Sequence, residues 1–202
     1  MDLNSAERIR ELTSGYEGER TAQGRPRVAD DILERMTKVT TEEAWGVLGS
    51  AGFQLQFEGD WINLHPEQVL VGRAVTCRYV PLRPDLNEVI QVEGEEHGRI
   101  GGQNSWVIDI LEEGDVLVVE LFGKVNRGTF IGDNLGTAIA TRTGGTGLVV
   151  DGGIRDTQRV RKLDMNVFTK GLHPSAIGEV TICLLYTSDA ADEGLGVDLG
   201  GR

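Results

Sequence analysis

The stretch 132–156 contains two short groups of residues whose types suit chemistry on a small anionic molecule. The first group is a turn at the expected start of a helix, and it consists of Gly132, Asp133, Asn134 and Leu135. The first N–H groups of a helix have no internal partners and lie at the positive end of the helix dipole. Such a turn can bind a carboxylate or a phosphate, although a simple helix cap formed by Asp133 or Asn134 explains the same residues.

The second group is Arg155 followed directly by Asp156, after an apolar run and the pair Gly152-Gly153. Loops at the carboxyl ends of strands are where α/β folds bind ligands. An arginine there can hold a carboxylate through two parallel hydrogen bonds. An aspartate suits a hard cation such as Mg²⁺, which takes one or two carboxylates and keeps several waters. A local salt bridge combined with a helix cap is the alternative interpretation of this pair.

The elements that must position these groups follow from hydrophobic periodicity. Helices are predicted at 6–12, 28–39, 41–50, 98–111, 133–142 and 155–163, and strands at 69–80, 115–121, 147–151 and 166–170. Thr40 and Glu43 are spaced as a capping box for the third helix. Residues 122–130 are predicted to be turn-rich, and 87–93 show no clear pattern. Strands that alternate with helices predict a layered α/β fold.

Length and composition limit the class of protein. The 202 residues fit one domain or at most two small ones, and we predict one at 29–182 after an N-terminal arm at 1–28. The formal net charge of -12 argues against nonspecific nucleic-acid binding, because phosphates are repelled by an acidic surface. The sequence has no apolar run of about 18 residues, so we expect no membrane partner and take a cytoplasmic location as the default.

Other candidate sites are weaker. His65, His97 and His173 lack metal-binding spacing, and we interpret them as structural or surface residues. No glycine-rich phosphate loop stands between a predicted strand and the helix after it. The two cysteines, Cys77 and Cys183, are too few for a disulfide framework and are interpreted as buried or incidental thiols.

The last 20 residues, CLLYTSDAADEGLGVDLGGR, differ in character from the chain that precedes them. The segment CLLYTSDAADE resembles the translation of an adapter used in sequencing libraries. We therefore expect Cys183–Arg202 to be an artefactual read-through on a C-terminally truncated natural chain, and we leave this tail out of the fold prediction.

The motif Gly132–Asp156, with NVFTKGLHPSA after it, resembles the family of class II pyruvate aldolases that includes 4-hydroxy-4-methyl-2-oxoglutarate aldolase. The same superfamily contains the RraA-type regulators of ribonuclease E activity. The resemblance covers Val69–Ile182. It implies the layered β/β/α, swivelling-domain-like fold of RraA-like proteins. It also implies a homotrimer or hexamer with the site near a subunit interface.

The resemblance also implies roles for the site residues. Gly132–Leu135 bind the substrate through the backbone, Arg155 contacts it, and Asp156 serves a divalent metal, Mg²⁺ or Mn²⁺. The implied reaction cleaves a 4-hydroxy-2-oxo acid, or decarboxylates oxaloacetate, to give pyruvate through a metal-stabilised enolate. A non-catalytic protein-binding regulator on the same scaffold is the alternative. One departure is that 21 residues separate Asp133 from Arg155, one more than the family aldolases usually have, and we assign the extra residue to the loop Thr143–Thr146.

Overall fold

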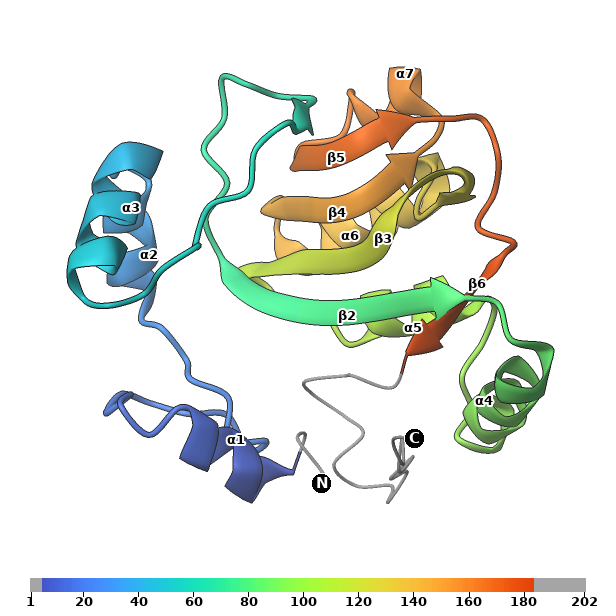
Figure 1. The fold of residues 1–202 in the computed structure, drawn as a ribbon, viewed down its shortest axis with the longest axis horizontal. Helices are drawn as coiled ribbons and strands as arrows, with labels where there is room; N and C mark the ends of the chain where they lie inside the picture. Colours follow the sequence, from blue (N-terminus) through green and yellow to red (C-terminus); the bar gives the residue numbers. More distant parts are fainter. Residues whose placement is uncertain (1–4, 184–202) are drawn as a thin grey trace.

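The computed structural model describes residues 5–183, which form an α/β fold around one six-stranded sheet (Figure 1). The strands are β1 Ile62–Asn63, β2 Arg73–Pro81, β3 Asp115–Thr129, β4 Gly147–Ile154, β5 Asn166–Leu172 and β6 Val180–Cys183. Their order across the sheet is β1-β5-β4-β3-β2-β6. The four central strands run parallel, and β1 and β6 run antiparallel to their neighbours. The α/β fold class predicted from the sequence is confirmed.

The helices connect and flank these strands. They are α1 Ala6–Leu12, α2 Asp30–Met36, α3 Thr41–Ser50, α4 Pro84–Glu96, α5 Gln103–Asp109, α6 Asp133–Thr143 and α7 Thr157–Val160. In Figure 1, α5 and α6 lie behind the sheet, whereas α2 and α3 form a pair set apart from it. Within residues 5–183, none of the helices has the length and apolar character needed to cross a bilayer.

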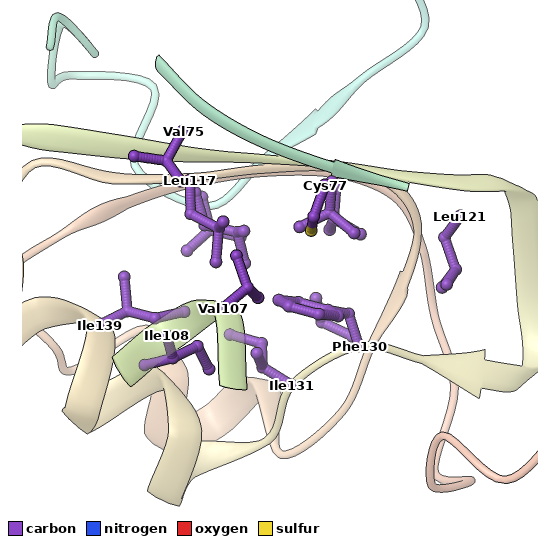
Figure 2. Packing of buried hydrophobic residues seen from close by; sticks show 14 of the residues in the cluster. Val75, Cys77, Val107, Ile108, Leu117, Leu121, Phe130, Ile131 and Ile139 are labelled. Carbon is purple, nitrogen blue, oxygen red and sulfur yellow. The ribbon is translucent and has the colours of Figure 1, made fainter. Parts of the chain in front are cut away.

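The core lies between one face of the sheet and the helices α5 and α6. Along β2 the side chains of Val75, Cys77 and Tyr79 are buried, whereas the residues between them are exposed. Figure 2 shows the strand side chains directed toward the residues contributed by α5, α6 and the loop between β3 and α6, which include Val107, Ile108, Phe130, Ile131 and Ile139. Removal of this apolar surface from water is the main stabilising contribution to the fold. Burial also raises the pKa of the Cys77 thiol, which makes it an unreactive core side chain.

The segment 122–130 differs from its prediction as a turn-rich loop, because β3 continues through it to Thr129. The pairing of β3 with β4 shifts register twice beyond Glu120, and Phe122 and Arg127 have positive φ angles. Gly152 and Gly153 of β4 make this irregular path possible. A Cβ on Gly152 would lie 2.6 Å from Leu121 Cδ2, so only glycine permits the close approach of the two strands.

One helix prediction was too long, and one unassigned segment is helical. The helix expected at 155–163 is limited to α7, because Asp156 has a left-handed backbone conformation with φ 54° and a helix cannot pass through it. The unassigned segment 87–93 lies inside α4, whose first residue is Pro84, a position where a missing N–H costs nothing. Buried Gly94 brings α4 against the Trp106 ring, and a Cβ there would lie 2.2 Å from Trp106 Cη2.

The helices α2 and α3 differ from the rest of the fold because neither contains a buried residue. The predicted capping box is present at the start of α3, where the Thr40 and Glu43 side chains each accept a backbone N–H of the other residue. Local hydrogen bonds of this kind define the helix start without any tertiary contact.

The N-terminal arm is tied to the end of the sheet where β2 and β3 begin. The Arg73 side chain donates to Val28 O at 3.0 and 3.1 Å and forms an ion pair with Asp30. Arg25 lies 3.5 Å from the buried carboxylate of Asp115. The predicted artefactual tail lies outside the described residues except for Cys183, which pairs with Arg78 as the last residue of β6.

Candidate functional site

The site is built where the loop between β3 and α6 meets the end of β4. The Phe130 N–H donates to Gly153 O at 2.8 Å, and the Arg155 N–H donates to Ile131 O at 3.0 Å. These two bonds continue the strand pairing beyond the regular ladder. They place the first residue of α6 beside the residues that follow β4, at the carboxyl end of the parallel strands.

Gly132 lies against both residues of the Arg155-Asp156 pair. A Cβ built at Gly132 would be 2.2 Å from Asp156 Oδ2 and 3.1 Å from Arg155 Nε. The backbone φ of Gly132 is -119°, a value open to any residue, so a larger residue here would be opposed by the close contact and not by the backbone conformation. The structure therefore brings together the two groups of residues that the sequence singled out.

The first turn of α6 is partly occupied by the protein's own carboxylates. The Asp133 N–H donates to Asp156 Oδ2 at 3.4 Å, and the Asn134 N–H donates to Asp133 Oδ1 at 3.0 Å. The Leu135 side chain packs on the core, and no acceptor among residues 5–183 serves its N–H. Asp133 thus caps the start of α6, which is the alternative that the sequence also allowed. The Leu135 N–H, at the positive end of the helix dipole, is left without a hydrogen-bond acceptor among the described residues.

The Arg155-Asp156 pair is not explained by a close salt bridge with a helix cap. Arg155 Nε lies 3.8 Å from Asp156 Oδ2, which is longer than a hydrogen bond. Asp156 is the N-cap of α7, but its side chain makes no capping bond. The left-handed conformation of Asp156 is unfavourable for a residue with a Cβ, and such positions occur often at functional sites. The Asp156 carboxylate is therefore weakly held and 38% exposed.

Arg159 is a site residue that the sequence analysis missed. Its Nη1 lies 2.6 Å from Asp133 Oδ2, so an ion pair joins α7 to the start of α6. The hydrogen bond from Arg159 holds the pKa of the Asp133 carboxyl below its usual value, and the same bond raises the pKa of Arg159. The two partners lie 26 positions apart in the sequence, so no local spacing signals this contact.

A cleft of about 540 Å³ adjoins these residues. It is lined by the ends of β4 and β5 and by α7, which lie together in Figure 1. Arg155, Asp156 and Arg159 line one part of this cleft, and His173, which directly follows β5, lines another. Its volume is within the range of small-molecule sites. From the sequence alone, His173 is expected to be a structural or surface residue.

The donor chemistry of the site fits a hydrated hard cation. No cluster of three or more His, Cys, Asp or Glu side chains suited to a metal ion occurs in the described part of the chain. Mg²⁺ needs no such cluster, because it is often held by one or two carboxylates together with water and substrate oxygens. Asp156, whose carboxylate has no close protein donor, is the residue placed to provide that ligand.

The comparison with protein families identifies the scaffold. Residues 27–183 match the family described as RraA-like, Aldolase/RraA. The chain belongs to the RraA-like family. The resemblance stated from the motif Gly132–Asp156 is thereby confirmed at the level of the family, which includes both aldolases and RraA proteins.

Solved structures with the same fold carry different names. RraAS2 of Streptomyces coelicolor, described as an unusual member of the RNase ES inhibitor RraA protein family, is 24% identical, with 79% of this chain and 72% of that chain covered and a TM-score of 0.55. An uncharacterized protein of Pseudomonas syringae pv. tomato is 23% identical, with 79% and 67% covered and a TM-score of 0.57. A protein described among novel cellulases of gut-associated microbes is 22% identical, with 91% and 74% covered and a TM-score of 0.59.

These similarities establish the RraA-like fold of the chain and not its activity, because one scaffold hosts many functions. The two groups of residues meet at the carboxyl end of β4, where the sequence analysis placed Arg155 and Asp156. The loop Thr143–Thr146, to which the extra residue was assigned, joins the end of α6 to the start of β4, at the opposite end of both elements. The roles of Gly132–Leu135, Arg155 and Asp156 stay predictions.

Proposed function

We propose that this RraA-like protein is a divalent-metal-dependent lyase that releases pyruvate from a 4-hydroxy-2-oxo acid or from oxaloacetate. The observation that carries the proposal is the convergence at Gly132, where a Cβ would lie within 2.2 Å of Asp156 Oδ2 and 3.1 Å of Arg155 Nε. A backbone turn, a cation and a weakly held carboxylate meet here, and the cation and the carboxylate line one cleft. These three kinds of group are what a 2-oxo acid and a cation require.

Binding of the substrate begins at its carboxylate. The start of α6 offers the open Leu135 N–H, and the dipole of this 11-residue helix favours a negative charge there. Arg155, whose side chain is 43% exposed, can reach the substrate from the opposite side of the turn. The proposed substrate is therefore a small 2-oxo acid held between a helix start and a guanidinium group.

The aldol cleavage and the decarboxylation of oxaloacetate both develop negative charge on the 2-oxo oxygen of the substrate. In the aldol cleavage the C4 hydroxyl gives its proton to water, the bond between C3 and C4 breaks, and C4 leaves as the carbonyl carbon of the second product. The electron pair of the broken bond moves into the 2-oxo group, which becomes an enolate. In oxaloacetate the same bond breaks and carbon dioxide leaves. Arg155 is assigned to stabilise the negative charge that develops on the 2-oxo oxygen, and a proton then returns to C3 to give pyruvate.

Asp156 is assigned to hold Mg²⁺ or Mn²⁺. A bound divalent cation supplies Lewis-acid stabilisation of the charge that develops on the substrate. Arg159 forms a short ion pair with the Asp133 carboxylate, whereas the Asp156 carboxylate has only the longer approach of Arg155 Nε at 3.8 Å.

A second candidate function is favoured by the description of one structural neighbour. The RraAS2 protein belongs to a family of RNase ES inhibitors. A non-catalytic regulator that binds a ribonuclease is therefore the alternative for this chain. The two functions differ in one property, because a regulator needs no metal-dependent turnover.

The test is an assay for pyruvate release from oxaloacetate and from 4-hydroxy-4-methyl-2-oxoglutarate. We expect turnover with Mg²⁺ or Mn²⁺ and its loss with chelator. The assay should include a full-length natural relative as well as this chain. Absence of metal-dependent pyruvate release from both proteins would favour the regulator.

A further inference from the structure

The loop between β3 and α6 is attached to two elements, and one of the attachments is a buried side chain that the proposed function does not use. The Phe130 N–H donates to Gly153 O at 2.8 Å, and Ile131 O accepts the Arg155 N–H at 3.0 Å, so both bonds join the loop to β4. A third bond comes from α5, where Asn104 Nδ2 donates to Phe130 O at 2.8 Å. The turn at the start of α6 follows this loop directly.

Asn104 is a polar residue in an apolar part of the core. The other buried residues of α5 are Trp106, Val107 and Ile108, and Figure 2 shows Phe130 directed into the same cluster. A buried carboxamide is unfavourable unless it is hydrogen-bonded. Because a carbonyl oxygen can only accept, the amide nitrogen must be the atom that faces Phe130 O. Within residues 5–183 no other donor serves this oxygen, so the two groups depend on each other.

The three hydrogen bonds together define the orientation of the loop. The two bonds to β4 attach one side of it, and two points of attachment still allow rotation about the line that joins them. The bond from Asn104 comes from a different element and opposes that rotation. Gly132 follows the loop, and a Cβ there would lie 2.2 Å from Asp156 Oδ2. A small rotation of the loop would therefore change the distance between the turn and Asp156.

We propose that Asn104 is a positioning residue, which holds the turn at Gly132 at the distance from Arg155 and Asp156 that lets one ligand contact both groups. The identity of that ligand as a 2-oxo acid rests on the proposed function. Asn104 acts through Phe130 O and does not touch the ligand. Loss of its donor should weaken binding of a 2-oxo acid, which needs the turn and the pair together. It should affect Mg²⁺ less, because the cation is assigned to Asp156 alone.

Three variants of Asn104 separate positioning from stability. Asn104→Leu removes the donor at similar side-chain volume and leaves Phe130 O unpaired. Asn104→Ala leaves space for a water molecule at Phe130 O, and it is measured in parallel so that the result does not depend on the folding of Asn104→Leu. Asn104→Gln keeps an amide donor on a longer side chain, for which a cavity of about 240 Å³ lined by Asn104 gives room.

The matched control is Asn166→Leu. Asn166 is buried, and its Nδ2 donates to Gln68 O at 2.9 Å, which is the same kind of bond from an amide to a loop carbonyl. It lies at the start of β5, at the opposite end of the parallel strands from the site. Denaturant unfolding measures the stability of each variant. Calorimetry on the full chain measures binding of Mg²⁺ alone and of pyruvate at saturating Mg²⁺.

We expect Asn104→Leu and Asn104→Ala to weaken pyruvate binding about tenfold or more, because small displacements of a site group have effects of this order. Their Mg²⁺ binding should change less than about twofold, which is close to no change in binding free energy. Asn104→Gln should recover part of the pyruvate affinity. Asn166→Leu should lose stability but bind both ligands like the wild type.

Two results would overturn the role of Asn104. Unchanged pyruvate affinity in Asn104→Leu or Asn104→Ala would show that the turn is positioned without it. Weakening of pyruvate and Mg²⁺ to the same extent, or the same loss in Asn166→Leu, would show that the bond only stabilises the fold.

Pyruvate release from oxaloacetate, measured on the same samples, distinguishes this role from the lyase activity. Selective loss of pyruvate binding in Asn104→Leu without any turnover by the wild type would support the role of Asn104 and contradict the lyase. Turnover by the wild type together with unchanged pyruvate binding in Asn104→Leu would contradict the role of Asn104 alone. Failure of the wild type to bind pyruvate with Mg²⁺ would contradict both.

Discussion

Asp156 combines three properties at the scale of a single residue. It adopts a left-handed backbone conformation, its carboxylate lies at the start of α6, and no protein donor approaches that carboxylate closely. A capping residue or a structural ion pair would show a short hydrogen bond instead. We interpret the unfavourable backbone conformation and the weakly held carboxylate together as signs that Asp156 is available to bind a ligand.

Gly132→Ala tests whether the contact at the turn positions Asp156. The added methyl group would overlap Asp156 Oδ2, and the carboxylate must then move. We expect kcat/KM for oxaloacetate decarboxylation to fall about a hundredfold, because a displacement of about 1 Å of a site group has effects of this size. The matched control is Gly49→Ala in α3, where an added Cβ meets nothing within 4 Å. Equal activity of the two variants would show that the turn is not part of the site.

The pair of Asp133 with Arg159 predicts a pH dependence. The Arg159 hydrogen bond lowers the folded-state pKa of Asp133 below its usual value of 3.8. The pair therefore stabilises the protein above about pH 3.8, and its contribution is lost as the pH falls through the lower folded-state pKa. Arg159→Ala should raise the pKa of Asp133 toward 3.8, measured by the side-chain carboxyl ¹³C shift. An unchanged pKa would contradict the ion pair.

The sequence predicted Arg155 and Asp156 but not Arg159. The first two are neighbours in the chain after a buried strand, a pattern that can be recognised in one dimension. The contact of Arg159 with Asp133 depends on where α7 begins, and that start is set by the unusual backbone of Asp156. Periodicity cannot reveal a left-handed residue that is not glycine.

At the scale of elements, close approaches between backbone segments set the positions of α4 and β3. Gly94 brings α4 against Trp106 of α5, and Gly152 lets β3 approach β4 after its register shift. The starts of β3, β4, β5 and α6 agree with the sequence prediction, since their apolar residues form recognisable runs and faces. The path of 122–129 did not, because its irregular pairing depends on glycines that lie on another strand.

Gly94→Ala tests the contact of α4 with α5. The methyl group would lie within about 2.2 Å of the buried Trp106 ring, so the helices must separate. We expect a loss of about 1–3 kcal/mol in the free energy of unfolding, as for other overpacked cores. Denaturant unfolding followed by tryptophan fluorescence measures it. Gly46→Ala in exposed α3 is the control, for which alanine should be neutral or slightly stabilising.

At the scale of the whole molecule, residues 30–57 are poorly explained by a single chain. The helices α2 and α3 bury no residue. The large apolar side chains exposed in this segment are Ile32, Met36, Val39, Trp45, Val47, Phe53, Leu55 and Phe57. Helices of 7 and 10 residues are marginal without tertiary packing. The homotrimer or hexamer expected from the resemblance would provide that packing, and it stays a prediction.

Leu55→Asp tests this prediction. Leu55 is 96% exposed, so a charge there costs little in the single chain, but it would be buried unpaired in an assembly. We expect light scattering after size-exclusion chromatography to show an oligomer for the wild type and a smaller species for the variant. Val69→Asp, at a position that is 61% exposed outside this segment, should keep the wild-type mass. A monomeric wild type, or an unchanged Leu55→Asp oligomer, would contradict the expectation.

The most direct test of the proposed lyase is the rate of Mg²⁺-dependent pyruvate release from oxaloacetate by the wild type and by Asp156→Ala. Arg161→Ala, at an exposed position at the end of α7 and outside the residues assigned to the site, serves as the control variant. The account predicts chelator-sensitive turnover in the wild type and the control, and none above background in Asp156→Ala. Equal metal-dependent rates in wild type and Asp156→Ala would contradict it.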